Sequence, residues 1–118
     1  MKLEIKYVKD HGEIKSERIV LKVLSNTNIG TYIVSDTTYY SENEVSNELR
    51  HVFWIPDKEV ERGDLVVVYT RSGKNKTVKN KSGNNTHFFY WGLSKTVWNK
   101  DGDAAILLSL SNWEFKKT

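Results

Sequence analysis

The chain has 118 residues, of which 38% are hydrophobic and 28% charged, and its formal net charge is +3. This length suits one domain spanning residues 1–118 and excludes a second hydrophobic core. The absence of cysteine excludes a disulfide framework, a thiolate metal site and a cysteine nucleophile. Because no stretch approaches the roughly 20 apolar residues of a membrane span, we expect a soluble, cytoplasmic protein without membrane contact.

The first strands are indicated by alternating and continuous apolar patterns. Residues 2–8 alternate charged and apolar side chains, which predicts a strand with one buried face rather than an export signal. Residues 17–25 are apolar on both faces, as in a central strand. After loop residues at 26–30, the chain is expected to be extended at 31–34.

One segment breaks the strand pattern. Ser41 and Glu44 have the spacing of a capping box, in which each side chain bonds to the other residue's backbone N–H group. Val45 and Leu49 have the i, i+4 spacing of one helical face. The sequence therefore predicts one short helical insertion around residues 41–50.

The second half of the chain alternates strands with turn residues. Residues 52–55 end at the only proline, Pro56, and residues 65–70 form the most β-branched run, which predicts a central strand. Residues 71–85 are rich in Gly, Ser, Asn and Lys and are expected to form a long loop or a hairpin tip. Further strands are expected at 86–91, 95–98, 104–110 and 113–115. Many short strands with one helical insertion indicate an all-β fold.

A polar turn precedes the last long apolar strand. Asp101, Gly102 and Asp103 suit a turn, because Asp and Gly tolerate positive φ and an Asp carboxylate accepts hydrogen bonds from backbone N–H groups. A calcium loop of the EF-hand type would need Gly at position 6 and Glu at position 12, which this segment lacks. We therefore expect a structural turn that binds no metal.

The candidate catalytic residues form no recognisable motif. The three histidines, His11, His51 and His87, lack the spacing of a metal site. An enzyme would need histidines and carboxylates that converge only in the folded chain. We expect a protein that is not an enzyme and uses neither metal nor cofactor.

Several motifs occur in the order found in one known family. Residues 98–108 resemble a W-N-x-x-G-D-x-A-x-L-L signature, and residues 29–36 resemble an L-x-G-W-x-L-S-D element. Residues 52–56 resemble an F-P strand, and residues 63–70 resemble a P-G-E-x-V-x-V-Y element. The chain thus resembles the lamin tail domain, as a stand-alone member of the bacterial type.

The resemblance implies an immunoglobulin-like antiparallel β-sandwich that serves as an interaction module and has no catalytic residues to transfer. The chain departs from the family pattern at Thr31 and Tyr32, which replace Gly-Trp, and at Arg62, which replaces a proline. Residues 41–50 resemble an insertion into the pattern.

Five cations are concentrated in the loop expected at residues 71–85, with no acidic residue between them: Arg71, Lys74, Lys76, Lys79 and Lys81. Subtracting these five from the formal net charge of +3 leaves −2, so the positive charge is local. Such a loop could hold phosphates while nearby aromatic rings stack on bases. The alternative is a solvated hairpin tip that keeps a β-protein soluble and discourages edge pairing.

The aromatic residues fall into two groups. Trp54, Trp98 and Trp113 lie in strand patterns and are expected in the core or packed against a sheet. Phe89 and Trp91 lie near the basic segment and are expected to be partly exposed, as candidate binding residues. The alternative for this pair is a hydrophobic floor beneath the loop.

These observations predict a non-enzymatic binding module whose macromolecular partner is expected to be a protein. The alternative is a nucleic-acid or polyanion binder that uses the basic loop at residues 71–81. A free sheet edge could support strand addition, so we expect a monomer or a weak homo-oligomer.

Overall fold

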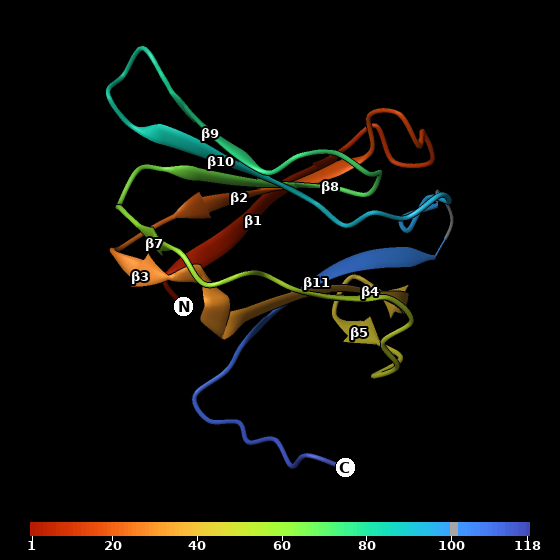
Figure 1. Cartoon of the computed structure of the whole chain (residues 1–118). Coiled ribbons are helices and arrows are strands. Elements are labelled where there is room, and N and C mark those ends of the chain that lie inside the picture. Colours follow the sequence, from red (N-terminus) through yellow and green to blue (C-terminus); the bar gives the residue numbers. More distant parts are fainter. Residues whose placement is uncertain (100–101) are drawn as a thin grey trace.

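The computed structural model describes residues 1–99 and 102–118. Two sheets stack as the layers of a β-sandwich, and a small two-stranded sheet lies at one end (Figure 1). The nearly all-β structure confirms the all-β class expected from the sequence. Among the described residues, no helix is long and apolar enough to cross a membrane.

The first sheet has five strands in the order β1, β2, β8, β10, β9. Their bounds are Leu3–Lys9, Arg18–Val23, Leu65–Tyr69, Asn85–Tyr90 and Lys76–Lys79, respectively. The β-branched strand β8 lies in the middle of this sheet, between β2 and β10, which confirms its central position.

The second sheet is built on the long strand β4 (Tyr32–Ser41). β11 (Asp103–Ser109) and β6 (Val52–Trp54) lie on opposite sides of β4, because both pair with residues 33–35. β5 (Glu44–Val45) pairs with the end of β4.

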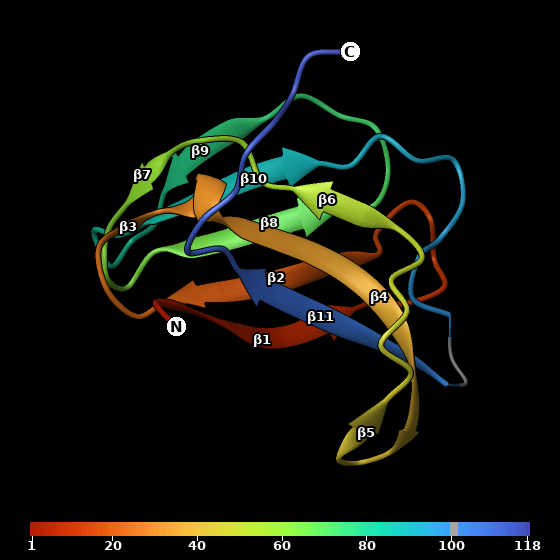
Figure 2. The ribbon, with the colours of Figure 1, turned by 90° about the horizontal axis from the view of Figure 1, so that it is seen from below.

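A smaller sheet and a 3-10 turn lie at the end of the sandwich where β4 begins. β3 (Thr27–Asn28) pairs with β7 (Glu59–Val60). The 3-10 turn (Ile29–Thr31) then leads directly into β4. Figure 2 shows the second layer in front of the first.

One strand pair departs from the antiparallel arrangement that was expected. β8 and β10 run parallel, from Leu65 opposite Thr86 to Tyr69 opposite Tyr90. The chain passes from β8 to the outer strand β9 and returns as β10, which lies between the two. Side chains alternate in the same way in both pairings, so the apolar pattern did not reveal this direction.

The short helix expected around residues 41–50 is wrong. β4 continues to Ser41, and the chain turns back so that Val45 pairs with Tyr39. The Ser46 hydroxyl lies 2.9 Å from that of Thr37, which ties the returning segment to β4. The i, i+4 pair Val45 and Leu49 lines a hollow over β11 instead of a helix face, because strand pairing outweighs the local helical preference.

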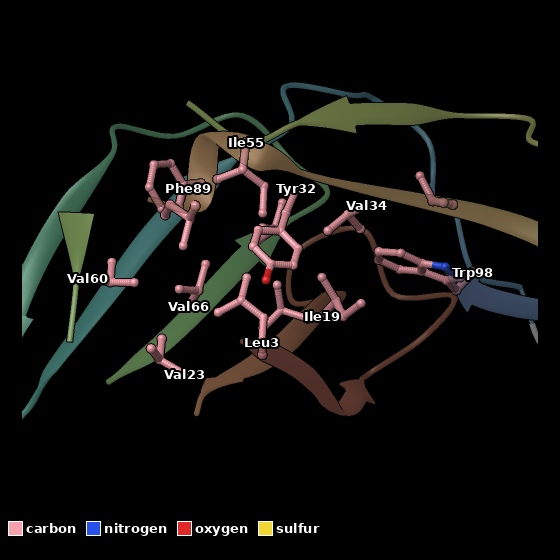
Figure 3. Close-up of a cluster of buried hydrophobic side chains, with 14 residues drawn as sticks. Leu3, Ile19, Val23, Tyr32, Val34, Ile55, Val60, Val66, Phe89 and Trp98 are labelled. Atoms are coloured by element: carbon pink, nitrogen blue, oxygen red, sulfur yellow. The ribbon is translucent and has the colours of Figure 1, made fainter. Parts of the chain in front are cut away.

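The core lies between the two sheets (Figure 3). Ile19 and Val66 project into it from the first sheet, and Tyr32 and Val34 from the second. Trp98 closes one end and is buried, as expected from the sequence. Burial of these side chains removes apolar surface from water and holds the layers together.

β1 presents a mixed face to the core. Leu3 is fully buried, whereas Ile5 borders the hollow beside β11 and Tyr7 is exposed beyond a bulge that shifts the register against β2. Val8, on the far side of the bulge, packs against the core. The simple alternation of the sequence therefore holds for only part of this strand.

A buried carboxylate joins three distant segments. Glu17 is 0% exposed and accepts hydrogen bonds from the Thr70 hydroxyl at 2.6 Å and from the Val97 N–H group at 2.7 Å. Its other oxygen accepts from the N–H groups of Gly12 at 2.8 Å and Trp98 at 3.2 Å. Four donors satisfy the carboxylate, which offsets the cost of removing its charge from water.

We expect Glu17→Ala to lower the free energy of unfolding by about 3 kcal/mol or more, because it leaves three buried donors and the partly buried Gly12 N–H group without an acceptor. Urea denaturation followed by tryptophan fluorescence measures the change. The exposed Glu13→Ala is the control and should stay within about 0.5 kcal/mol of the wild type. Equal stabilities of the two variants would contradict this role for Glu17.

Candidate functional site

The five predicted cations lie on one hairpin and its approach. Arg71 follows β8, Lys74 lies in the connecting loop, Lys76 and Lys79 are on β9, and Lys81 lies in the turn before β10. All are exposed except the half-buried Arg71. The hairpin alternative for residues 71–85 is therefore the one that the structure adopts.

Arg71 lies over two stacked tyrosines on the outer face of the first sheet. Its guanidinium carbon is 4.8 Å from the ring centroid of Tyr69 and 5.1 Å from that of Tyr90. The two rings are 5.2 Å apart and nearly parallel, at 13°. The guanidinium is oriented by hydrogen bonds to the carbonyl oxygens of Lys15 and Ser72. Cation–π attraction and these bonds hold the group in place.

Two further cations extend this arrangement along the same face. Arg18 lies opposite Tyr69 in the strand register, with its guanidinium carbon 5.4 Å from the ring centroid. Lys76 lies opposite Phe88, with its ammonium 5.5 Å from that ring. We call Arg18, Tyr69, Arg71, Lys76, Phe88 and Tyr90 the cationic ladder. Sequence reasoning missed Arg18, because only the β2–β8 pairing brings it to the ladder.

The two aromatic candidates do not both lie on this face. Phe89 is only 4% exposed and packs in the core, because it alternates with the outward-facing Phe88 and Tyr90. The expected exposure of Phe89 is therefore wrong. Trp91 is half-buried, and its ring centroid lies 5.6 Å from that of Phe53 and 5.8 Å from that of Trp98.

A buried aspartate anchors the base of the hairpin. Asp64 accepts from the Asn85 N–H group at 3.0 Å, and its other oxygen lies 2.8 Å from the His87 Nε2 atom. Burial would raise the pKa of Asp64, but the hydrogen bonds from Asn85, His87, Glu61 and Asn84 outweigh it, and the pKa is lowered. Gly63 supplies the preceding turn with φ of 93°.

His51 and His87 lie on different elements and bond to different carboxylates, and His11 is exposed in the turn after β1. His87 on β10 lies between Asp64 and the Thr77 hydroxyl, which is 3.3 Å from its Nδ1 atom. His51 lies before β6, with its Nδ1 atom 3.0 Å from Asp36. Within the described residues, no group of three or more His, Asp or Glu side chains could hold a metal ion. Both ring nitrogens of His87 are engaged within the protein, which accounts for the residue structurally.

The turn before β11 has the hydrogen bond expected of an Asp at this position. Asp103 Oδ2 accepts from the Asn99 N–H group at 2.8 Å, and Gly102 has φ of 83°. Its other oxygen lies 3.5 Å from the Arg50 guanidinium. Asp101 lies outside the described residues.

Two tryptophans expected in the core lie on the surface instead. Trp54 is 44% exposed and Trp113 is 58% exposed, so a core position is wrong for both. Their ring centroids are 4.8 Å apart, and the ring planes meet at 87°. Trp54 pairs with Ile33 on β4, and that position faces away from the core because it alternates with the buried Tyr32 and Val34.

The outer face of the second sheet carries two hollows. One, of about 380 Å³, lies between Trp54 and Trp113 and is also lined by Pro56 and Asp57. The other, of about 300 Å³, lies between β11 and the turn after β5 and is lined by Thr37, Val45, Asn47, Leu49, Ile106 and Leu108. We call these the tryptophan pocket and the hairpin hollow, the latter after the β4–β5 hairpin and not the basic β9–β10 hairpin.

A third hollow opens at the edge of the sandwich. It has a volume of about 500 Å³ and lies where β1 and β11 run side by side (Figure 2). Its apolar lining includes Leu3, Ile5, Leu24, Ala105 and Leu107. We call it the edge hollow. β11 therefore has an apolar hollow on each of its two faces.

Comparisons with known proteins add no further assignment. No protein-family model matches the chain, and neither a characterised protein nor a solved structure matches it significantly. The function is therefore inferred from the geometry of the two outer faces and of β11 at the edge of the second sheet.

The lowered pKa of Asp64 makes its contribution to stability dependent on pH. We expect Asp64→Asn to lower the free energy of unfolding by about 1–3 kcal/mol at neutral pH. The deficit should shrink as pH falls through the ordinary value of 3.8 towards the lower folded pKa, where the wild-type carboxylate is protonated too. Urea denaturation of both proteins from neutral pH to about pH 3 tests this, and a constant difference would contradict it.

Proposed function

We propose that the protein is a non-enzymatic binding module that holds an extended segment of a partner protein along β11. The observation that carries the proposal is the character of this strand. β11 pairs with β4 on one side, and within the described residues its other edge forms no strand pair. Free edges can accept an added strand through backbone hydrogen bonds.

The other long edges are protected, whereas β11 is not. β1 carries Lys6 and a bulge, and β9 carries Lys76 and Lys79, all of which discourage pairing with another chain. β11 reads Asp-Ala-Ala-Ile-Leu-Leu-Ser, with one charge at its beginning and no proline. An unprotected apolar edge suits a strand that accepts a partner.

The two hollows beside β11 match the side-chain period of an added strand. Successive side chains of a strand point to opposite faces of the sheet. One set would point towards the hairpin hollow, next to Leu108, and the other towards the edge hollow, next to Leu107. Backbone pairing would supply affinity and the hollows would supply a preference for apolar side chains at alternate positions.

Acidic residues around the outer face define the charge of the partner. Glu42, Glu44 and Glu48 are exposed on and beside the turn that bounds the hairpin hollow, and Asp57 lies at the tryptophan pocket. A segment with alternating apolar residues and flanking Lys or Arg is complementary to this rim. We therefore propose a partner of that composition.

Peptide selection tests this proposal without knowledge of the partner. We expect a displayed library of random peptides to yield binders with alternating apolar residues and an excess of Lys and Arg. Ile106→Lys should weaken the binding of these peptides at least about tenfold, because a lysine beside the free edge of β11 opposes strand addition.

Val78→Lys on the edge strand β9 is the matched control, because it adds the same charge to an exposed edge position of the other sheet. Its peptide affinity should equal that of the wild type. Unchanged affinity in Ile106→Lys would contradict the proposal. A third outcome is that no peptide binds and the wild type dimerises with rising concentration, whereas Ile106→Lys stays monomeric. The strand added along β11 would then come from a second copy of this chain and not from a partner protein.

A second candidate function, polyanion binding, is favoured by the cationic ladder. Its aromatic rings and positive groups lie on one open sheet face, next to the exposed lysines of the basic hairpin. Stacked rings and nearby cations are the combination used to bind single-stranded nucleic acids. The arginine that covers Tyr69 and Tyr90 would have to share these rings with the bases.

We expect polyanion binding to depend on the lysines of the β9–β10 hairpin and its approach, at positions 74, 76, 79 and 81. Changing these four to Glu should abolish binding of a fluorescent oligothymidylate, measured by anisotropy, and binding by the wild type should weaken steeply with salt. The control changes Lys2, Lys95, Lys116 and Lys117 to Glu, which gives the same net charge. Equal losses in both variants would contradict a specific role for the hairpin.

The likeness to an immunoglobulin-like lamin tail domain belongs to this proposal. The order of the sequence motifs supports it, as does the glycine turn at Gly63 before the apolar strand β8. The parallel pairing of β8 and β10 is a departure from an antiparallel sandwich. A cytoplasmic location, supported by the lack of cysteine, completes the proposal.

A further inference from the structure

The tryptophan pocket has walls of two kinds. Trp54 and Trp113 meet at 87° and supply two broad aromatic surfaces at nearly a right angle. Pro56 adds an apolar surface and Asp57 adds a carboxylate. The pocket has a volume of about 380 Å³ and opens onto the outer face of the second sheet.

The orientation of the first tryptophan is fixed by the backbone. The indole N–H group of Trp54 donates to the Gly30 carbonyl oxygen at 2.7 Å. This bond uses the polar edge of the ring, so the aromatic surface remains for a ligand. β6 holds the residue in place through its pairing with Ile33 on β4.

The carboxylate is placed by the same glycine. Gly30 has no Cβ atom, and one built there would lie 2.8 Å from the Cα atom of Asp57. Asp57 can therefore pack directly against residue 30, next to the ring edge of Trp54. Within residues 1–99 and 102–118, Asp57 forms no ion pair. The ammonium group of the adjacent Lys58 instead donates a hydrogen bond to the Thr77 hydroxyl oxygen.

The second tryptophan comes from the segment that follows β11. The Leu110 N–H group donates to the Thr31 carbonyl oxygen at 2.8 Å, which starts this segment beside the pocket. Trp113 then lies edge-to-face with Trp54. Because Trp113 is largely exposed and lies outside the core cluster, the fold does not depend on it.

We propose that the tryptophan pocket binds an alkylammonium group, as carried by a lysine side chain of the partner protein, methylated or unmodified. Aromatic faces attract cations through their quadrupole, and tryptophan does so best. The carboxylate adds direct attraction and would repel an anion. The methylene groups of a lysine fit against Pro56 and the indole rings.

That the bound lysine belongs to a partner protein rests on the proposed function. Binding of a cation by the pocket does not depend on that function. The pocket and the hairpin hollow lie on the same outer face, so one bound segment could reach both. The test therefore uses free blocked amino acids, which need no strand addition.

The probes are acetylated and amidated forms of lysine, trimethyllysine and Nε-acetyllysine. NMR of the tryptophan indole N–H groups reports binding at each ring. Lysine and trimethyllysine should shift the Trp54 and Trp113 signals in a saturable way. The neutral Nε-acetyllysine should bind at least about tenfold more weakly.

Variants separate the charge from the aromatic walls. Asp57→Asn should weaken the binding of trimethyllysine several-fold. Glu59→Gln, which neutralises a nearby exposed carboxylate, should leave that binding unchanged. Trp113→Ala should abolish saturable binding without altering the core. Equal binding of the neutral and charged probes, or unchanged binding in Trp113→Ala, would overturn the pocket assignment. Neither result would affect peptide binding along β11, so failures of the two proposals are distinguishable.

Discussion

The carboxylate of Glu17 is the constraint on which the arrangement of the sandwich depends. Among residues 1–99 and 102–118 it has no ion-pair partner, and its four hydrogen bonds come from the turn before β2, the end of β8 and the segment around Trp98. Each of these segments must be in its native place for the charge to be tolerated. The hydrogen bonds of Glu17 therefore fix the end of the sandwich that Trp98 closes. The strand edges and surface pockets keep their positions relative to this end.

Strand alternation gives the two layers different surfaces. On the first sheet, the residues opposite the core side chains form the cationic ladder, and Arg18, Tyr69 and Tyr90 are neighbours across three strands. On the second sheet, the outward positions include Ile33 and Trp54, with acidic residues beyond them. One molecule therefore presents a basic aromatic face and an apolar face with an acidic rim, which suit different partners.

Most of the strands could be predicted from periodicity, and most of the binding surfaces could not. The continuous apolar runs at β8 and β11 indicated strands, although only β8 is buried on both faces and β11 is half-buried. Strand direction, the bulge in β1 and the turn at Val45 depend on contacts between distant residues. The outward position of Trp54 follows from its pairing with Ile33, and the pocket at Gly30 depends on a contact with Asp57. These relations leave no local signal.

The insertion of β10 between β8 and β9 constrains the order of events during folding. The β9–β10 hairpin is local and can form early, but its inner strand can dock only after the chain beyond β8 has looped around the place it will occupy. Closing this loop costs chain entropy before any pairing with β8 compensates for it. Docking of the hairpin onto β8 is therefore the expected slow step in assembling the first layer, and until it occurs the apolar, β-branched strand β8 keeps one edge unpaired.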